Sequence, residues 1–170
     1  MNDKVLLVGL TGSGTSTVGA ALATRLGWPY LDDDTLMVRT AGSTASELLA
    51  TQGDEAVRAA ESRVLTLMLG MPGPVVCSLP SRVVEDEANR ERLTASGAHV
   101  VWLRATPAVL ARRLLRAAGR VRQAPEVASR LDAQSAGLDG LFEEVADQVV
   151  DVDAIPAGAA AKLVVEALAT

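Results

Sequence analysis

Five short apolar runs alternate along the chain with longer segments of helical periodicity. The runs span residues 4–9, 29–34, 74–79, 99–104 and 148–153. They are apolar almost throughout, as strands covered on both faces of a parallel sheet are. A repeated strand and helix alternation requires right-handed crossovers and is typical of an α/β fold. We therefore expect three layers, α/β/α, around a five-stranded parallel sheet.

The segments between these runs carry apolar residues at helical spacing. We predict helices within 16–27, 43–69, 83–97, 106–119 and 159–170. Thr106 before Pro107 is typical of a helix start, and Gly27, Gly97 and Gly119 are placed to end helices. No internal repeat or linker interrupts the pattern, so the 170 residues are predicted to form a single domain.

Composition restricts the possible partners. The aromatic residues are few, namely Trp28, Tyr30, Trp102 and Phe142, which disfavours binding of nucleic acid by base stacking. The net charge of −5 has the wrong sign for tracking a phosphate backbone. No apolar stretch is long enough to span a membrane, and the N-terminus enters a strand without a signal peptide. The single Cys77 is expected to be a buried thiol in a reducing compartment, which favours the cytoplasm. Together these features predict a protein that binds neither nucleic acid nor membrane, and we expect it to be a monomer.

A glycine-rich stretch, VGLTGSGTST at 8–17, follows the first predicted strand and opens a helix. It fits the phosphate-binding pattern G-x-x-x-x-G-K-[ST] except that Thr15 replaces the lysine. Inward-facing amides and the positive end of the helix hold a polyphosphate mostly by main chain. The alternative is a glycine-rich turn without a ligand. We predict that nucleotide phosphates contact Gly9, Gly12, Ser13, Gly14, Thr15, Ser16 and Thr17.

Three consecutive carboxylates, Asp32, Asp33 and Asp34, end the second predicted strand. A sequence tolerates their mutual repulsion mainly where a cation or a proton transfer uses them. In an extended chain Asp32 and Asp34 would point to one side and Asp33 to the other. A solvated acidic turn is the alternative.

The order and spacing of these motifs resemble the shikimate kinase family. Residues 5–61 carry the phosphate loop, a D-x-D at the second strand, a T-x-x-S-x-A-x-x-[LF] helix entry and G-[DE]-x-x-[FV]-R-x-x-E. The likeness continues through 100–123 and 141–153, and so spans most of the chain. It implies a P-loop kinase fold, with a lid segment at about 112–128, that transfers phosphate from ATP to a small-molecule hydroxyl with Mg²⁺.

The resemblance also implies roles for individual residues. Asp34 matches the base that binds the acceptor, and Arg122 matches a lid arginine that reaches the phosphates. Ser16 and Asp32 would hold Mg²⁺. Arg113 would lie near the adenine. The acceptor would be bound by Asp34, Arg58 and Glu61, although the last two are spaced to form a surface salt bridge with each other.

Departures from the family pattern fall at functional positions. The segment SLPSR at 78–82 replaces a run of glycines, and Leu138 replaces an arginine that grips the acid group of shikimate. VVCSLPSR instead resembles gluconate kinases, where Arg82 would supply an anion contact. A surface residue at a helix start is the alternative for Arg82. Shikimate itself is therefore not expected to be the acceptor.

The missing lysine leaves three hypotheses open. Loss of one such electrostatic contact commonly costs a phosphoryl transfer about a hundredfold to a thousandfold in rate. An active small-molecule kinase would need compensation from the lid arginines, Arg112, Arg113, Arg116, Arg120 and Arg122. The alternatives are a catalytically weakened protein that binds a nucleotide or anion, and an interaction protein that keeps only the scaffold.

Overall fold

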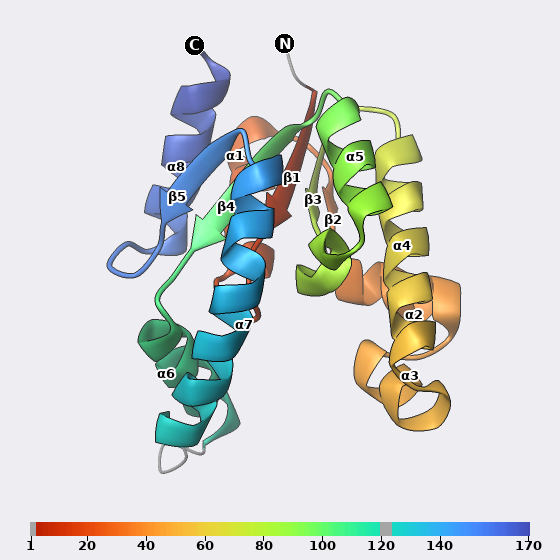
Figure 1. The fold of residues 1–170 in the computed structure, drawn as a ribbon. Coiled ribbons are helices and arrows are strands. Elements are labelled where there is room, and N and C mark those ends of the chain that lie inside the picture. The colour runs from red at the N-terminus through yellow and green to blue at the C-terminus, as the bar shows by residue number, and fades with distance from the viewer. Residues whose placement is uncertain (1–2, 120–123) are drawn as a thin grey trace.

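The computed structural model describes residues 3–119 and 124–170 and has the expected three-layer α/β/α architecture (Figure 1). One five-stranded parallel sheet has the order β2-β3-β1-β4-β5. Its strands are β1 Lys4–Val8, β2 Tyr30–Leu31, β3 Val75–Ser78, β4 His99–Arg104 and β5 Gln148–Asp151. Each lies inside a predicted run, so the number and position of the strands are confirmed.

Eight α-helices and one short 3-10 helix are assigned in the described residues. They are α1 Thr15–Leu26, α2 Asp33–Ala41, α3 Ala45–Gln52, α4 Asp54–Gly70, η1 Ser81–Glu85, α5 Glu87–Ala95, α6 Pro107–Ala118, α7 Ala124–Val145 and α8 Ala157–Leu168. Thr106 is the N-cap of α6, and Gly27 and Gly119 end α1 and α6 in the left-handed conformation, as predicted.

Two separate cores cover the faces of the sheet. Val5 and Leu7 of β1 pack with α1 and α8, whereas Leu6 and Val8 pack with α4, α5 and α7. All four side chains are 0% exposed, because β1 lies between β3 and β4 in the sheet and helices cover both of its faces. Figure 1 shows α1 and α8 behind the sheet and α7 in front of it.

Several predicted boundaries are wrong, each for a local reason. The second strand ends at Leu31, and Asp33 and Asp34 lie in the first turn of α2. The helix predicted at 43–69 is two helices, because Gly53 adopts φ 89° and ψ 178° between α3 and α4. The segment 83–97 begins as η1 before α5. Neither α2 nor α7 is predicted by the apolar spacing.

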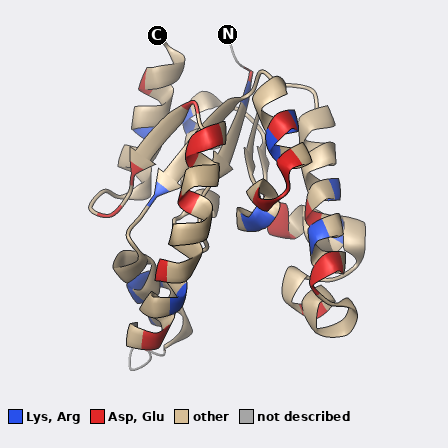
Figure 2. Cartoon of the chain, viewed as in Figure 1, with Lys and Arg blue, Asp and Glu red and all other residues tan. Residues whose placement is uncertain are grey.

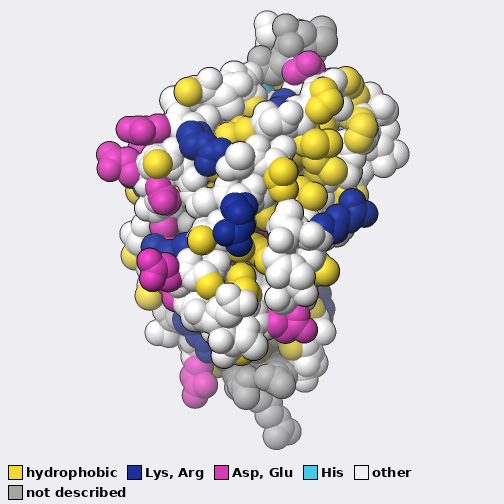
Figure 3. Space-filling model, turned by 90° about the vertical axis from the view of Figure 1, so that its right-hand side faces the viewer, with side chains coloured by type: hydrophobic (Ala, Val, Ile, Leu, Met, Phe, Trp, Pro, Cys, Tyr) yellow, Lys and Arg dark blue, Asp and Glu magenta, His cyan; other side chains and the backbone are white. Residues whose placement is uncertain are grey.

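The surface carries several exposed apolar side chains. Among the described residues, no helix combines the length and apolar character needed to cross a membrane. Hydrophobic side chains gather toward the upper right of the face in Figure 3. The exposed apolar residues of α4 and its C-cap include Leu67 and Met71. Cys77 is buried, as predicted, and burial raises the pKa of its thiol to about 12.

Phe142 tests the packing of α7 against the sheet. Its ring is 0% exposed and stacks on Trp102 of β4 with 5.7 Å between ring centroids. Phe142→Ala is expected to lower the free energy of unfolding by about 3–5 kcal/mol, because it leaves a cavity in this core. Urea denaturation checks this value, with Leu163→Ala, whose side chain is 44% exposed, as the control. Equal effects of the two changes would contradict the assignment of Phe142 to the core.

Candidate active site

The glycine-rich stretch forms a loop at the carboxyl edge of the sheet, directly between β1 and α1. Gly12 and Gly14 adopt φ of 93° and 94°, a region that L side chains rarely enter, and Gly14 is the N-cap of α1. The loop borders a cavity of about 640 Å³. Every loop residue predicted to contact phosphate lines this cavity, namely Gly9, Gly12, Ser13, Gly14, Thr15, Ser16 and Thr17.

Ser13 adds an unsatisfied polar group to the wall of this cavity. Its side chain is 2% exposed, and its hydroxyl has no hydrogen-bond partner among the described residues. A Cβ at Gly9 would lie 2.5 Å from this hydroxyl and 2.8 Å from the Leu103 carbonyl oxygen. The loop is therefore packed too closely for any larger residue at position 9. It offers main-chain amides, the start of a helix and a free hydroxyl, which is the chemistry that phosphate oxygens require.

Asp32 and Ser16 come together beside the loop. The Ser16 hydroxyl donates to Asp32 Oδ1 at 3.1 Å, and Asp32 also caps α2 by accepting from the Thr35 amide at 3.2 Å. The Tyr30 hydroxyl donates to the same carboxylate at 3.2 Å. A hydroxyl and a carboxylate at the edge of a phosphate loop are the hard oxygen donors that Mg²⁺ prefers, so this pair fits the ion.

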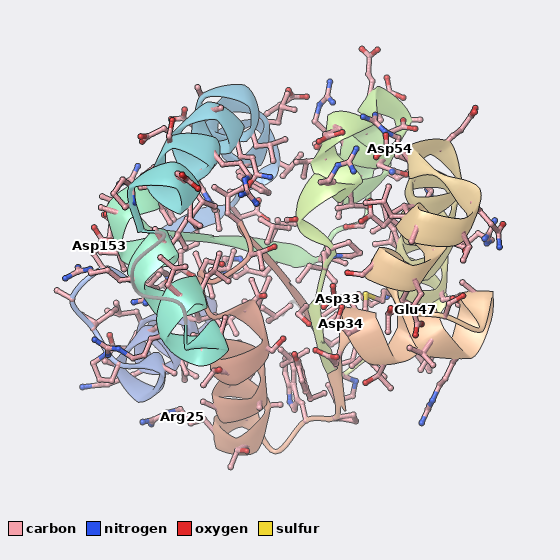
Figure 4. The ribbon with its side chains drawn as sticks, turned by 90° about the horizontal axis from the view of Figure 1, so that it is seen from below. Arg25, Asp33, Asp34, Glu47, Asp54 and Asp153 are labelled. Carbon is pink, nitrogen blue, oxygen red and sulfur yellow. The ribbon has the colours of Figure 1, made fainter. Side chains whose placement is uncertain are left out.

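Asp33 and Asp34 both line the cavity, which corrects the expectation that they point to opposite sides. The reason is that they lie in a helical turn and not in an extended strand. Figure 4 looks onto this edge of the sheet and shows both near its centre. Asp34 is exposed, whereas Asp33 accepts a hydrogen bond from Ser78 Oγ at 3.0 Å. Burial and the neighbouring charge of Asp34 raise the pKa of Asp33 to about 6.

Arg58 and Arg82 are held by carboxylates outside the cavity. Arg58 is 2.9 Å from Asp54 and 2.9 Å from Glu85, so the alternative in which it pairs with Glu61 is not found. Arg82 lies 2.6 Å from Asp54 and 3.1 Å from Glu85. Hydrogen bonds from Arg82 and Arg58 lower the pKa of Asp54 to about 2. Figure 2 shows these opposite charges together at η1 and the start of α4.

Glu61 lines the cavity without a partner. Its side chain is 7% exposed, and no hydrogen bond or ion pair joins it to another described residue. Burial is the main cause that raises its pKa to about 7, and the nearby Arg82 opposes this rise only in part.

The predicted lid segment, at about 112–128, begins within α6. Arg113 of α6 lines the cavity and donates to the carbonyl oxygens of Gly12, at 3.3 Å, and Val152. Arg112 and Arg116 are exposed on the same helix. Arg120 and Arg122 lie outside the described residues.

Other residues of the site carry no clear signal in the sequence. Tyr30 and Ser78, whose hydroxyls are 2.9 Å apart, link β2 and β3 to the acidic residues. Neither residue is assigned a role from the sequence, although Ser78 begins the SLPSR segment. Ile155 and Pro156 line the cavity after β5. Leu138 is buried, and with Arg82 it lines a second cavity of about 530 Å³ beyond the loop.

A family model described as shikimate kinase matches residues 11–169. The chain belongs to the shikimate kinase family. It is 34% identical over 161 residues to shikimate kinase 2 of Sodalis glossinidius, covering 92% of this chain and 90% of the relative. It is 34% identical over 167 residues to shikimate kinase of Halorhodospira halophila, covering 98% of this chain and 93% of the relative.

Solved structures agree with this assignment. Shikimate kinase from Acinetobacter baumannii in complex with shikimate superposes with a TM-score of 0.86 at 25% identity, covering 99% of this chain and 94% of that one. A gluconokinase from Sinorhizobium meliloti superposes with a TM-score of 0.60 at 22% identity, covering 98% of this chain and 95% of that one. The latter likeness shows a shared fold alone.

The raised pKa of Asp33 predicts that the free energy of unfolding depends on pH. Since folding raises this pKa from 3.8 to about 6, the folded state is penalised once the carboxyl ionises. The penalty is absent below pH 4, grows between pH 4 and 6 and is complete above that range. Asp33→Asn is therefore expected to raise the free energy of unfolding by about 1–2 kcal/mol at pH 8 and by little at pH 4. Thermal melts at both pH values check this, with Asp132→Asn, an exposed change on α7, as control. A gain of equal size at both pH values would contradict it.

Proposed function

We propose that this chain is an ATP-dependent phosphotransferase that acts on a hydroxyl group of a small molecule. The observation that carries the proposal is a single cavity lined by the phosphate loop on one side and by Asp34 on the other. Membership of the shikimate kinase family supports the same reaction class. The family uses ATP with Mg²⁺, and the loop and the Ser16–Asp32 pair fit these two ligands.

In the proposed reaction the acceptor oxygen bonds to the terminal phosphorus as the bond to the leaving nucleotide oxygen breaks. Asp34 takes the proton from the acceptor hydroxyl. The amides of the loop and the start of α1 hold the phosphate oxygens in line with the acceptor. Ser16 and Asp32 would hold Mg²⁺, which neutralises phosphate charge when bound.

We further propose that shikimate is not the preferred acceptor. Shikimate is an acid, and each arginine near its expected position is neutralised by carboxylates, since Arg58 and Arg82 share Asp54 and Glu85. Leu138 is buried and offers no charge. The relatives described above are nevertheless named shikimate kinase, so an assay with shikimate tests this proposal directly.

Nucleotide binding is the first expected outcome. The protein should bind MgATP and MgADP, because the main-chain part of the phosphate site is intact. Isothermal titration calorimetry and thermal shift measure this, with a nucleoside lacking phosphates as control. Absence of both heat and thermal shift at millimolar MgATP would contradict the kinase proposal at its first step.

The second expected outcome concerns the choice of acceptor. In a coupled assay of ADP release, shikimate should be phosphorylated poorly or not at all, since Arg58 and Arg82 are both paired with carboxylates of the protein. Rapid turnover of shikimate would show that Arg58 or Arg82 leaves its partners when the acid arrives.

Thr15 favours a second candidate function, a binding protein with weakened catalysis. It is the first residue of α1 and lines the cavity, where an ammonium would meet the terminal phosphates. Thr15→Lys is expected to tighten MgATP binding and, in a decayed kinase, to speed phosphoryl transfer about a hundredfold. Thr24→Lys adds the same charge to an exposed position of α1 and is the matched control.

A comparison with Arg122→Ala separates the two functions. A large gain from Thr15→Lys with little loss from Arg122→Ala indicates decayed catalysis. The reverse result indicates an active kinase in which the arginine compensates for the lysine, because a second cation would then meet a like charge. If neither change alters nucleotide affinity, the loop does not hold phosphates.

A further inference from the structure

The acceptor side of the cavity is lined by negative charge. Asp33 and Asp34 from α2 and Glu61 from α4 line it, and the described lining residues include one cation, Arg113. The guanidinium of Arg113 donates to the Gly12 and Val152 carbonyl oxygens, so it sits at the loop and not beside Glu61. A ligand that reaches past the loop toward α4 therefore meets carboxylates.

Glu61 is the strongest single indication of a ligand. Burying a charged carboxylate costs free energy unless the group is paired or protonated. Glu61 is largely buried, and no hydrogen bond or ion pair joins it to another described residue. Burial, together with the charges of Glu85, Asp33 and Asp54, raises its pKa to about 7, against the opposing effect of Arg82. The side chain borders open space in the cavity, so a cation from solution can reach it.

Arg58 and Arg82, the two arginines that could neutralise Glu61, already form ion pairs with other carboxylates. Arg82 donates to both oxygens of Asp54, at 2.6 Å and 3.2 Å, and to both oxygens of Glu85, at 3.1 Å and 3.3 Å. Arg58 bridges the same two carboxylates. An acidic ligand would have to compete with Asp54 and Glu85 for both arginines and would leave these carboxylates without partners.

We propose that the acceptor is a hydroxylated amine, whose ammonium group is bound by Glu61 and Asp33 while its hydroxyl faces Asp34 and the phosphate loop. This inference rests on the proposed kinase function and names the acceptor class. An organic cation suits the site better than a metal ion, because no three acidic, histidine or cysteine side chains of the described residues are grouped as metal ligands. An ammonium also donates several hydrogen bonds, enough for two carboxylates.

Two matched sets of probes test the charge preference on the full chain in the presence of MgADP. The open-chain set is D-glucamine, D-sorbitol and D-gluconate. The cyclic set is trans-4-aminocyclohexanol, cyclohexane-1,4-diol and trans-4-hydroxycyclohexanecarboxylate. Within each set the members differ in one group, which is an ammonium, a hydroxyl or a carboxylate. By calorimetry the amine is expected to bind at least tenfold more tightly than the acid in one set or both, with the neutral alcohol between them.

Glu61→Gln provides the residue-level test. It is expected to weaken amine binding about tenfold while leaving binding of the neutral alcohol unchanged, because the amide keeps the shape but loses the charge. Glu55→Gln, an exposed change on the same helix, should alter neither. Should Glu61→Gln not fold, the ranking of amine over acid by the unaltered protein still decides the question.

Three results overturn the inference: acids that bind as tightly as amines, no binding of either amine, or amine binding that Glu61→Gln leaves intact. If MgADP binds normally in those experiments, the kinase proposal stands and only the acceptor class is wrong. If MgADP itself fails to bind, the proposed function fails independently of the acceptor.

Discussion

The enclosure of β1 is the constraint on which the site depends. Its residues Val5–Val8 are 0% exposed, hydrogen-bonded between β3 and β4 and packed into both cores. A strand so enclosed fixes the point where the chain leaves the sheet. Because α1 must then return over one face, the loop between them turns at the carboxyl edge of the sheet, where its residues line the cavity. The position of the phosphate site thus follows from the burial of one strand.

The missing lysine does not disturb this arrangement. The loop is shaped by Gly12 and Gly14 and by close packing around Gly9, none of which requires a charge at position 15. A main-chain phosphate site can therefore persist whether catalysis is retained through other cations or lost. For this reason the geometry of the loop is stronger support for nucleotide binding than for rapid phosphoryl transfer.

The acceptor region differs from the loop because side chains, and not main chain, define it. Arg58 and Arg82 neutralise Asp54 and Glu85, and the cavity is left with Glu61, Asp33 and Asp34. Family membership fixes the fold, and under our proposal the choice of acceptor depends on these few charges.

The sequence by itself determined the strand and helix alternation, the parallel sheet, the loop and the neighbouring acidic cluster, because these depend on periodicity and local spacing. It did not determine that Asp33 and Asp34 lie in a helix, because three consecutive polar residues show no apolar periodicity that would indicate one. It also missed α7, which packs chiefly against the preceding helix α6 and also contacts η1, α5 and β4. Only the tertiary structure decided that Arg58 pairs with Asp54 and Glu85 and not with Glu61. That choice depends on η1, which brings Glu85 from a remote part of the chain beside the start of α4.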